Sequence, residues 1–258
     1  MREATVTHRL SNPGALFQLV EAKYQNDVLL ADLRSSFNLC GYVALPHLFC
    51  PESFDLLREE VQNLQIHAAK RDFTMPGYET PRRLQTVGAQ VICSVSPLLF
   101  STYLHFDIKM LVREITGGPV FACQHPQEFM VANFLEGKQA THGWHLDDPP
   151  FALVLFFDAP SQAEGGCLEF IPEWHSFCAR HHVDAYKQVA GAVEVARTEG
   201  LVQIRHHATR DAYLLRADKC LHRVPELQSI TARRAVLNLA FQNEREMLYG
   251  ETANLLYR

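Results

Sequence analysis

The spacing of apolar residues changes character near residue 118. Before it, apolar side chains recur at the intervals of an amphipathic helix, with charged residues between them, as in Phe54, Leu57, Val61 and Leu64. Between two such segments, a glycine opens a short apolar stretch that is typical of a strand. The pattern predicts helices over 13–26 and 51–69, and a strand over 41–45.

A third predicted helix has its own start and stop signals. Ser96 is a good N-cap, and Pro97 is tolerated in a first helical turn, where its missing N–H has no partner to lose. Gly117 and Gly118 follow, and glycine readily adopts the left-handed conformation that ends many helices. We expect one continuous helix between these signals.

From residue 119 the chain has the pattern of a series of short strands. Apolar stretches alternate with turns, and many short strands with turn signals indicate a β-sandwich or barrel. A more polar, helical segment at 173–199 interrupts the series. The predicted strands are 119–123, 127–135, 151–158, 167–171, 201–206, 212–216 and 234–242. We predict a mostly β fold with α-helices, in which N-terminal helices buttress a β core.

Length and composition fit one domain. The chain has 258 residues, 47 % of them apolar, which is enough to bury one large core. We predict a single domain over 1–258, with a helical part over about 1–118, a core over about 119–245 and an insertion over about 173–199. The sequence leaves the oligomeric state open.

Charge and cysteine content narrow the classes of partner. The formal net charge is −5 and no lysine- or arginine-rich run is present, which argues against a nucleic-acid binder. No apolar run reaches the length of a membrane span, and the first residues do not resemble a signal peptide. The seven cysteines form no CxxC pair, so we expect reduced thiols in a cytoplasmic protein.

The sharpest chemical signal is THGWHLDDPP at 141–150. Side chains at i and i+2 of an extended segment share a face, so His145 and Asp147 can meet one ion while Leu146 points away. A second histidine from another strand completes a 2-His-1-carboxylate triad, which is typical of non-haem Fe(II) and leaves positions open for a co-substrate and O₂. Among thirteen histidines we predict His222, in a stretch with two short strands and a turn.

An arginine downstream supports this choice. Arg234 begins the apolar stretch RAVLNLAF, and strand alternation places it on one face with Asn238, while the other face is wholly apolar and is expected to pack on the core. A guanidinium binds a carboxylate through two hydrogen bonds, as the distal carboxylate of 2-oxoglutarate requires. Arg233 faces the other way, so we predict Arg234 as the co-substrate anchor.

A second arrangement of similar spacing competes with this one. It combines His206 and His207 with Arg216, but Arg216 is followed by ADKC rather than by an apolar strand. HxD alone is common by chance. The prediction therefore depends on the conjunction of HxD, a β-rich stretch, a histidine in HRV and an arginine at the head of an alternating strand.

With this conjunction the chain resembles the Fe(II)/2-oxoglutarate-dependent oxygenase superfamily, over roughly residues 37–242. The stretches GYV near Gly41 and GGCLEFIP at 165–172 add to the resemblance. It implies a double-stranded β-helix, or jelly roll, as the core. It also implies Fe(II) bound by the triad, with 2-oxoglutarate and O₂ as co-substrates.

Within the superfamily, the chain resembles the bacterial halogenases of free amino acids such as lysine and their hydroxylase relatives. The resemblance implies substrate-binding roles for Glu128, His142, Asp148, Arg82, Arg83 and Asn238. The arginine, histidine and asparagine side chains suit the carboxylate of a basic amino acid, and the two acids suit its ammonium groups. The halogenases have a small residue in place of Asp147, where chloride binds, so this carboxylate predicts hydroxylation.

Three alternatives remain open at this point. The same iron chemistry can act on a peptidyl, carrier-bound or other small-metabolite substrate. A non-catalytic metal-binding jelly roll fits the same ligands but has no use for Arg234. A hydrolytic zinc enzyme also fits them, but the sequence offers no convincing separate general base. The segment 173–199 and the C-terminal stretch 251–258, through Tyr257, are candidates for covering the pocket.

Overall fold

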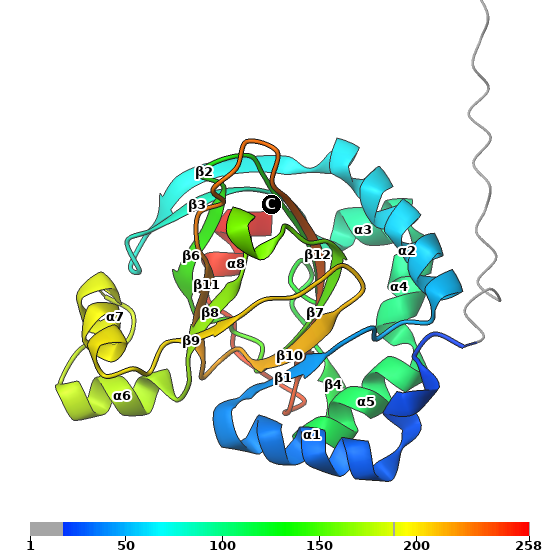
Figure 1. Cartoon of the computed structure of the whole chain (residues 1–258), viewed down its shortest axis with the longest axis horizontal. Coiled ribbons are helices and arrows are strands. Elements are labelled where there is room, and N and C mark those ends of the chain that lie inside the picture. The colour runs from blue at the N-terminus through cyan, green and yellow to red at the C-terminus, as the bar shows by residue number, and fades with distance from the viewer. Residues whose placement is uncertain (1–17, 188, 258) are drawn as a thin grey trace, which may run out of the picture.

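A computed structural model describes residues 18–187 and 189–257 of the chain (Figure 1). Its strands are β1 (Tyr42–Leu45), β2 (Ala69–Met75), β3 (Thr80–Val87), β4 (Phe121–Ala122), β5 (Met130–Glu136), β6 (Thr141–His145), β7 (Phe151–Asp158), β8 (Leu168–Ile171), β9 (Gln203–Arg205), β10 (Ala212–Arg216), β11 (Leu221–Val224) and β12 (Arg233–Gln242). Its α-helices are α1 (Asp27–Cys40), α2 (Pro51–Leu64), α3 (Ala89–Val95), α4 (Pro97–Leu104), α5 (Phe106–Thr116), α6 (Trp174–His181), α7 (Val189–Thr198) and α8 (Thr252–Tyr257).

The strands form one antiparallel sheet that curls on itself (Figure 1). Along the sheet the order is β1-β10-β7-β12-β5-β3-β6-β11-β8-β9, while β2 pairs with β3, and β4 with β12. Strand β3 pairs with both β5 and β6, so it joins the half that carries β7, β10 and β12 to the half that carries β6, β8 and β11. This is the jelly roll that the sequence predicts.

The N-terminal helices cover the outer face of the larger half of the sheet, as predicted (Figure 1). In β12, Leu237 and Leu239 point to this side and pack in one core cluster with Leu57 of α2 and Val112 of α5. Val236, with the opposite parity, belongs to a second cluster inside the barrel. The predicted alternation of this strand is therefore confirmed, and it leaves one face of β12 directed into the barrel.

The first predicted helix is wrong in the described part of 13–26, and residues 13–17 lie outside the described residues. Residues 18–26 contain only the short 3₁₀ helix η2 (Ala22–Gln25). The long helix α1 follows, and the side-chain oxygen of its N-cap, Asn26, accepts a hydrogen bond from the backbone N–H of Leu29 at 3.0 Å. Cap chemistry, which favours asparagine at this place, decides the start of the helix here.

The hairpin of β2 and β3 lies in the region that was expected to be helical. The predicted helix 51–69 ends at Leu64 and continues as a 3₁₀ turn over Gln65–His67. Along β2 (AKRDFTM), partly buried and exposed positions alternate up to the buried Met75. Because the strand contains three charged residues, its sequence does not resemble that of a core strand. An antiparallel hairpin with one face in water tolerates that composition.

The third predicted helix is broken at His105. Ser96 caps α4 as expected, and Gly117 ends α5 in the left-handed conformation, with a φ of 69°. Between them, His105 has an extended backbone, and its Nδ1 accepts a hydrogen bond from the N–H of Asp107 at 3.2 Å. This second N-cap starts a new helix, so two shorter helices replace the continuous one.

Helices α6 and α7 form the insertion at 173–199 and cover the smaller half of the sheet (Figure 1). Trp174 and Phe177 of α6 pack in one apolar cluster with Trp144 of β6. The Nη2 of Arg197 in α7 also lies 3.2 Å from a carboxylate oxygen of Glu169 in β8. The insertion is therefore tied to the strands that neighbour β11.

No single helix in the described part of the chain is long and apolar enough to cross a membrane. One bent pair, Ala89–Val95 with Pro97–Thr116, meets the length and composition criteria together, at a bend of 117°.

The C-terminal helix α8 returns the chain to the mouth of the barrel (Figure 1). Arg71 Nε and Thr86 Oγ1 donate to the carbonyl oxygen of Leu256 at 2.7 and 2.8 Å. Gly88 lies against the same segment, where an added Cβ would be 2.9 Å from the carbonyl oxygen of Tyr257. The absence of a side chain at Gly88 therefore lets α8 dock.

We expect Gly88→Ala to loosen α8, because the new methyl group would overlap backbone atoms of Tyr257. Overpacking of this kind costs about 1–3 kcal/mol, which is about a 5- to 150-fold rise in local opening. Hydrogen exchange of the amides in 252–257 measures it. Gly118→Ala is the matched control, because nothing lies within 4 Å of its added Cβ. Equal exchange in both variants would contradict the docking role.

Candidate metal centre and co-substrate pocket

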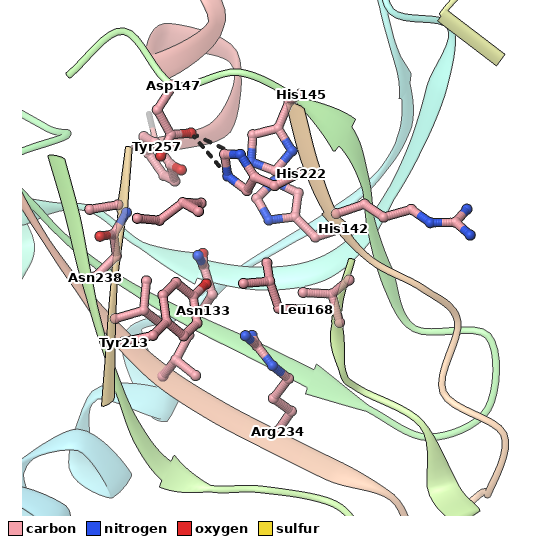
Figure 2. A pocket seen from close by; sticks show the side chains of 16 residues that line it. Asn133, His142, His145, Asp147, Leu168, Tyr213, His222, Arg234, Asn238 and Tyr257 are labelled. Atoms are coloured by element: carbon pink, nitrogen blue, oxygen red, sulfur yellow. Dashed lines mark ion pairs between the residues drawn. The ribbon is translucent and has the colours of Figure 1, made fainter. Parts of the chain in front are cut away.

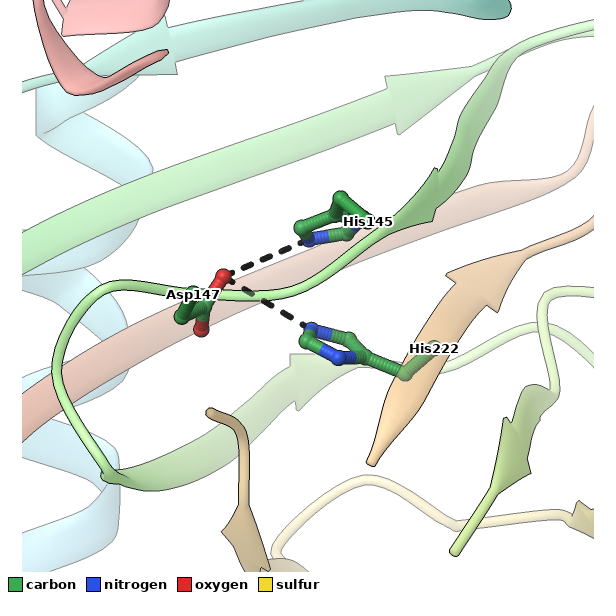
Figure 3. A group of neighbouring side chains, drawn as sticks. All are labelled: His145, Asp147 and His222. Carbon is green, nitrogen blue, oxygen red and sulfur yellow. Dashed lines mark ion pairs between the residues drawn. The ribbon is translucent and has the colours of Figure 1, made fainter. Parts of the chain in front are cut away.

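Three side chains converge at the open end of the barrel (Figure 3). His145 ends β6, Asp147 follows two residues later, and His222 on β11 is the direct cross-strand partner of His145. Oδ1 of Asp147 lies 3.5 Å from Nε2 of His145 and 3.8 Å from Nε2 of His222. The three ligand atoms lie within 4.8 Å of one another. The predicted triad therefore comes together from two strands and a turn.

Hydrogen bonds orient both imidazoles toward a common point. Nδ1 of His145 donates to the carbonyl oxygen of Gly143 at 2.7 Å, and Nδ1 of His222 donates to that of Cys220 at 2.9 Å. This tautomer leaves each Nε2 lone pair free for a metal ion. Burial lowers the pKa of His145 well below its usual value, so this ring is neutral, as ligation requires.

The carboxylate of Asp147 is the third ligand and lies in a low-dielectric site. Its pKa is raised, first because of burial, and His222 is the main group that opposes the shift. A largely enclosed carboxylate next to imidazole rings is poorly compensated without a cation. One carboxylate with two imidazoles is also the donor set that non-haem Fe(II) uses. The residues therefore fit a divalent iron ion.

Arg234, the predicted co-substrate anchor, lies deeper in the barrel (Figure 2). Arg234 is 3 % exposed and lines the same cavity as the triad. Tyr213 forms a hydrogen bond with its guanidinium, which also lies over the ring of Phe156, 4.9 Å from the centroid. Arg233 instead projects outward, with 58 % of its side chain exposed, and pairs with Glu136 at 3.0 Å. The structure places Arg234, and not Arg233, in the cavity.

The competing arrangement of histidines does not come together. His206 is exposed, and Arg216 forms an ion pair with Asp218 at 2.7 Å. His207 lies at the far end of the barrel, against Phe156. Within the described residues, the triad is the one group of three side chains whose ligand atoms converge in this way.

Two predicted substrate residues line the cavity beside the triad (Figure 2). The ring of His142 stacks on that of His145, with centroids 4.2 Å apart, and Asn238 projects from β12. The Nε2 of His142 and the Oδ1 of Asn238 are buried without hydrogen-bond partners among the described residues, as is the Oδ1 of Asn133. Buried polar atoms are nearly always paired in native proteins, so these atoms indicate a bound ligand.

Arg82 and Glu128 are buried close to this cavity. Arg82 is the cross-strand partner of His142, and its Nη1 donates to the hydroxyl of Thr80 at 3.0 Å. Its Nε and Nη2, and the Oε2 of Glu128, are buried without partners among the described residues. Burial lowers the pKa of Arg82 to about 10 and raises that of Glu128 well above its usual value, with Asp147 adding to the second shift. Glu128 lies in the turn before β5, not on the strand.

Arg83 and Asp148 are placed differently from these residues. Arg83 lies on the opposite face of β3, with 42 % of its side chain exposed, and pairs with Glu226 at 3.0 Å. Asp148 is partly buried and accepts a hydrogen bond from the N–H of Gly250 at 2.7 Å, which ties the C-terminal segment to the metal loop. The structure therefore separates Arg83 from the cavity and keeps Asp148 at its rim.

The sequence analysis missed Tyr213 and Asn133 as residues that line the cavity. Both lie on strands that were predicted, and both are polar side chains in otherwise apolar stretches. That contrast is a usable signal, but it needs the inward parity of each strand to be known. Tyr257, a candidate from the sequence, does line the cavity from α8.

Solved structures with the same fold share little sequence with this chain. The carbocyclase SnoK from nogalamycin biosynthesis is 15 % identical, with a TM-score of 0.64, and 82 % of this chain and 83 % of that chain are covered. HygX from Streptomyces hygroscopicus, with nickel and 2-oxoglutarate bound, is 13 % identical, with a TM-score of 0.60 and coverage of 87 % and 92 %. A prolyl hydroxylase from Trichoplax adhaerens is 13 % identical, with a TM-score of 0.57 and coverage of 86 % and 92 %. No curated protein matches significantly in sequence.

The fold and the His-Asp-His triad define the class, which is that of the iron- and 2-oxoglutarate-dependent oxygenases. Fe(II), 2-oxoglutarate and O₂ are the cofactor and co-substrates of this class. A model of the family described as Halogenase D matches residues 24–257. The chain therefore belongs to the Halogenase D family.

We expect Asp147→Ala to weaken Fe(II) binding by at least about 100-fold. Loss of a residue that only hydrogen-bonds to a metal ligand already lowers metal affinity by about 10- to 100-fold, and loss of a ligand should cost more. Anaerobic titration of metal-free protein measures the affinity. Asp72→Ala is the matched control, because this carboxylate is exposed on β2. Unchanged iron affinity in Asp147→Ala would show that the triad is not the metal site.

Proposed function

We propose that the protein hydroxylates a free amino acid, with basic amino acids such as lysine as the preferred class. The observation that carries the proposal is the set of buried, unpaired polar atoms of both charges beside the triad. Arg82 supplies positive charge, and Glu128 supplies negative charge. An apolar or singly charged substrate would leave one of these groups uncompensated, whereas a zwitterion with a further ammonium group compensates both.

Arg82 is the candidate for the substrate carboxylate. Its two unpaired guanidinium nitrogens suit a planar carboxylate, and His142 and Asn238 supply further polar atoms near the triad. The charge of Asp147 is among those that act on Arg82, which supports its proximity to the triad. Arg83 has no part in this proposal, because it lies on the other face of β3 and pairs with Glu226.

Glu128 and Asp148 are the candidates for ammonium groups. The pKa of Glu128 is raised first by burial and then by the negative charges of Asp147 and Asp148. An ammonium group next to Glu128 would relieve both effects, so the site favours a cation. Tyr257 closes the cavity from α8, and the charges of Asp147 and Glu128 also act on its hydroxyl.

The residues of the chain position the reactants and exclude water. Arg234, which is hydrogen-bonded to Tyr213, would hold the distal carboxylate of 2-oxoglutarate. Apolar side chains such as Leu168 and Val154 line the same cavity. The triad would hold iron, which when bound would supply the O₂ activation that couples oxidative decarboxylation of 2-oxoglutarate to attack on a C–H bond. Selectivity follows from the two charged ends of the substrate, which hold one carbon near the metal.

The carboxylate of Asp147 supports hydroxylation rather than halogenation. In the resemblance to amino-acid halogenases, a small residue at this position leaves room for chloride. Here Oδ1 of Asp147 lies near the Nε2 atoms of both histidines, in the position of the third ligand (Figure 3). The family includes halogenases by its description, so chlorination is the second candidate reaction.

We expect purified protein with Fe(II), 2-oxoglutarate, ascorbate, air and chloride to convert a basic amino acid into a product heavier by one oxygen atom, with one succinate formed per product. Mass spectrometry of reactions with each free amino acid measures this. A chlorinated product would overturn the assigned reaction. Turnover of peptides or carrier-bound residues alone would overturn the assigned substrate, and no succinate with any compound would indicate a non-catalytic protein.

We expect Arg82→Gln to lower kcat/KM for the amino acid by at least about 30-fold, mainly through KM, because loss of one partner of a buried charge pair costs about 2–5 kcal/mol. Arg83→Gln is the matched control, because it changes the adjacent residue on the exposed face. Both variants should keep the wild-type affinity for Fe(II) and 2-oxoglutarate. Similar kinetics for the two variants would remove Arg82 from the substrate site.

A further inference from the structure

The rings of Phe156 and His207 lie next to one another beside Arg234, and the reaction described above does not use them. The guanidinium of Arg234 lies over the ring of Phe156 on β7, and its central carbon is 4.9 Å from the ring centroid. On the same ring, the imidazole of His207 stacks at 4.6 Å between centroids, with an angle of 19° between the planes. The ring of Phe156 therefore contacts both the co-substrate anchor and His207.

His207 is held in this position by a second contact. Its Nε2 lies 2.9 Å from the hydroxyl of Tyr42 on β1. Strand β10 pairs with β1 on one side and with β7 on the other. Its ring is also 4.9 Å from that of Tyr213, whose hydroxyl bonds to Arg234. The loop after β9 thus contributes a ring that touches both aromatic neighbours of the guanidinium.

The charge state of His207 suits this place. Burial, and then the nearby positive charge of Arg234, lower the pKa of His207 to about 3, so the ring is neutral at ordinary pH. Nε of Arg234 and Nδ1 of His207 are both buried without hydrogen-bond partners among the described residues. Among the described residues, the neighbours of this guanidinium are therefore the aromatic side chains of Phe156 and Tyr213.

We propose that His207 and Phe156 are positioning residues that set the depth of Arg234 and thereby the length of keto diacid that the protein accepts. The triad fixes one end of the co-substrate and Arg234 the other, so the floor behind Arg234 determines the separation of the two anchors. 2-Oxoglutarate has two methylene groups between its keto carbon and its distal carboxylate, and 2-oxoadipate has three. Removing the floor lets the guanidinium retreat and make room for the longer acid.

The test compares the binding of these two acids without turnover. Nickel-loaded protein is titrated calorimetrically with 2-oxoglutarate and with 2-oxoadipate, and the ratio of the two Kd values is the readout. One methylene group in a fitted site is worth about 10- to 200-fold, so the wild-type protein should prefer 2-oxoglutarate by a factor in this range. In His207→Ala, the preference should fall by at least about 5-fold, because 2-oxoglutarate weakens while 2-oxoadipate does not.

Two further variants complete the comparison. His207→Phe keeps a ring on Phe156 and should restore most of the wild-type preference, although it loses the bond to Tyr42. His206→Ala, which removes the exposed histidine next in sequence, should leave both affinities unchanged. Circular dichroism and nickel stoichiometry verify folding, and Phe156→Leu gives the same readout if His207→Ala does not fold.

An unchanged Kd ratio in His207→Ala and Phe156→Leu would overturn the proposal, and so would equal weakening of both acids, which indicates a general structural role. The proposal depends on 2-oxoglutarate as co-substrate but not on the amino-acid substrate, which is absent from the titrations. Failure of the wild-type protein to bind 2-oxoglutarate would overturn the co-substrate assignment itself. The two failures are therefore distinguishable.

Discussion

The pairing of β6 with β11 is the constraint on which the site depends. It places His145 directly opposite His222, with ring centroids 4.1 Å apart, and the chain then turns so that Asp147 reaches both Nε2 atoms. Each imidazole is oriented by a backbone carbonyl two residues earlier in the chain. A slip of one residue would turn either ring to the opposite face, because side chains alternate along a strand. Metal binding and strand register are therefore set by the same contacts.

The barrel interior combines polar function with apolar walls. Side chains of β12 alternate between a helix-covered core, which contains Leu237, and a cavity that contains Arg234 and Asn238. Burial of polar and charged groups without partners costs free energy, and unpaired atoms of Asn133, His142 and Asn238 line the cavity. This conflict between folding and function is expected at a binding site.

Helices and a hairpin supply what the barrel alone lacks. The N-terminal helices cover the outer face of the larger half of the sheet, and α6 and α7 cover the smaller half (Figure 1). Helix α8 closes the open end with Tyr257, held through the carbonyl of Leu256 by side chains of the β2–β3 hairpin. Strand β3 of the same hairpin places Arg82 opposite His142. The hairpin therefore contacts both the neighbourhood of the triad and the helix that covers the cavity. The cavity is therefore lined and covered by parts of the chain that are far apart in sequence.

The sequence by itself determined the β core, the triad, the parity that selects Arg234 over Arg233, and the ends of the third helical region. All of these depend on local periodicity or on short motifs, which act over a few residues. Only the tertiary structure decided that Arg82 and not Arg83 faces inward, that the charged segment 69–75 is a strand, and that His207 lies behind Arg234. These facts depend on which strands pair and which faces water reaches, and non-local packing determines both.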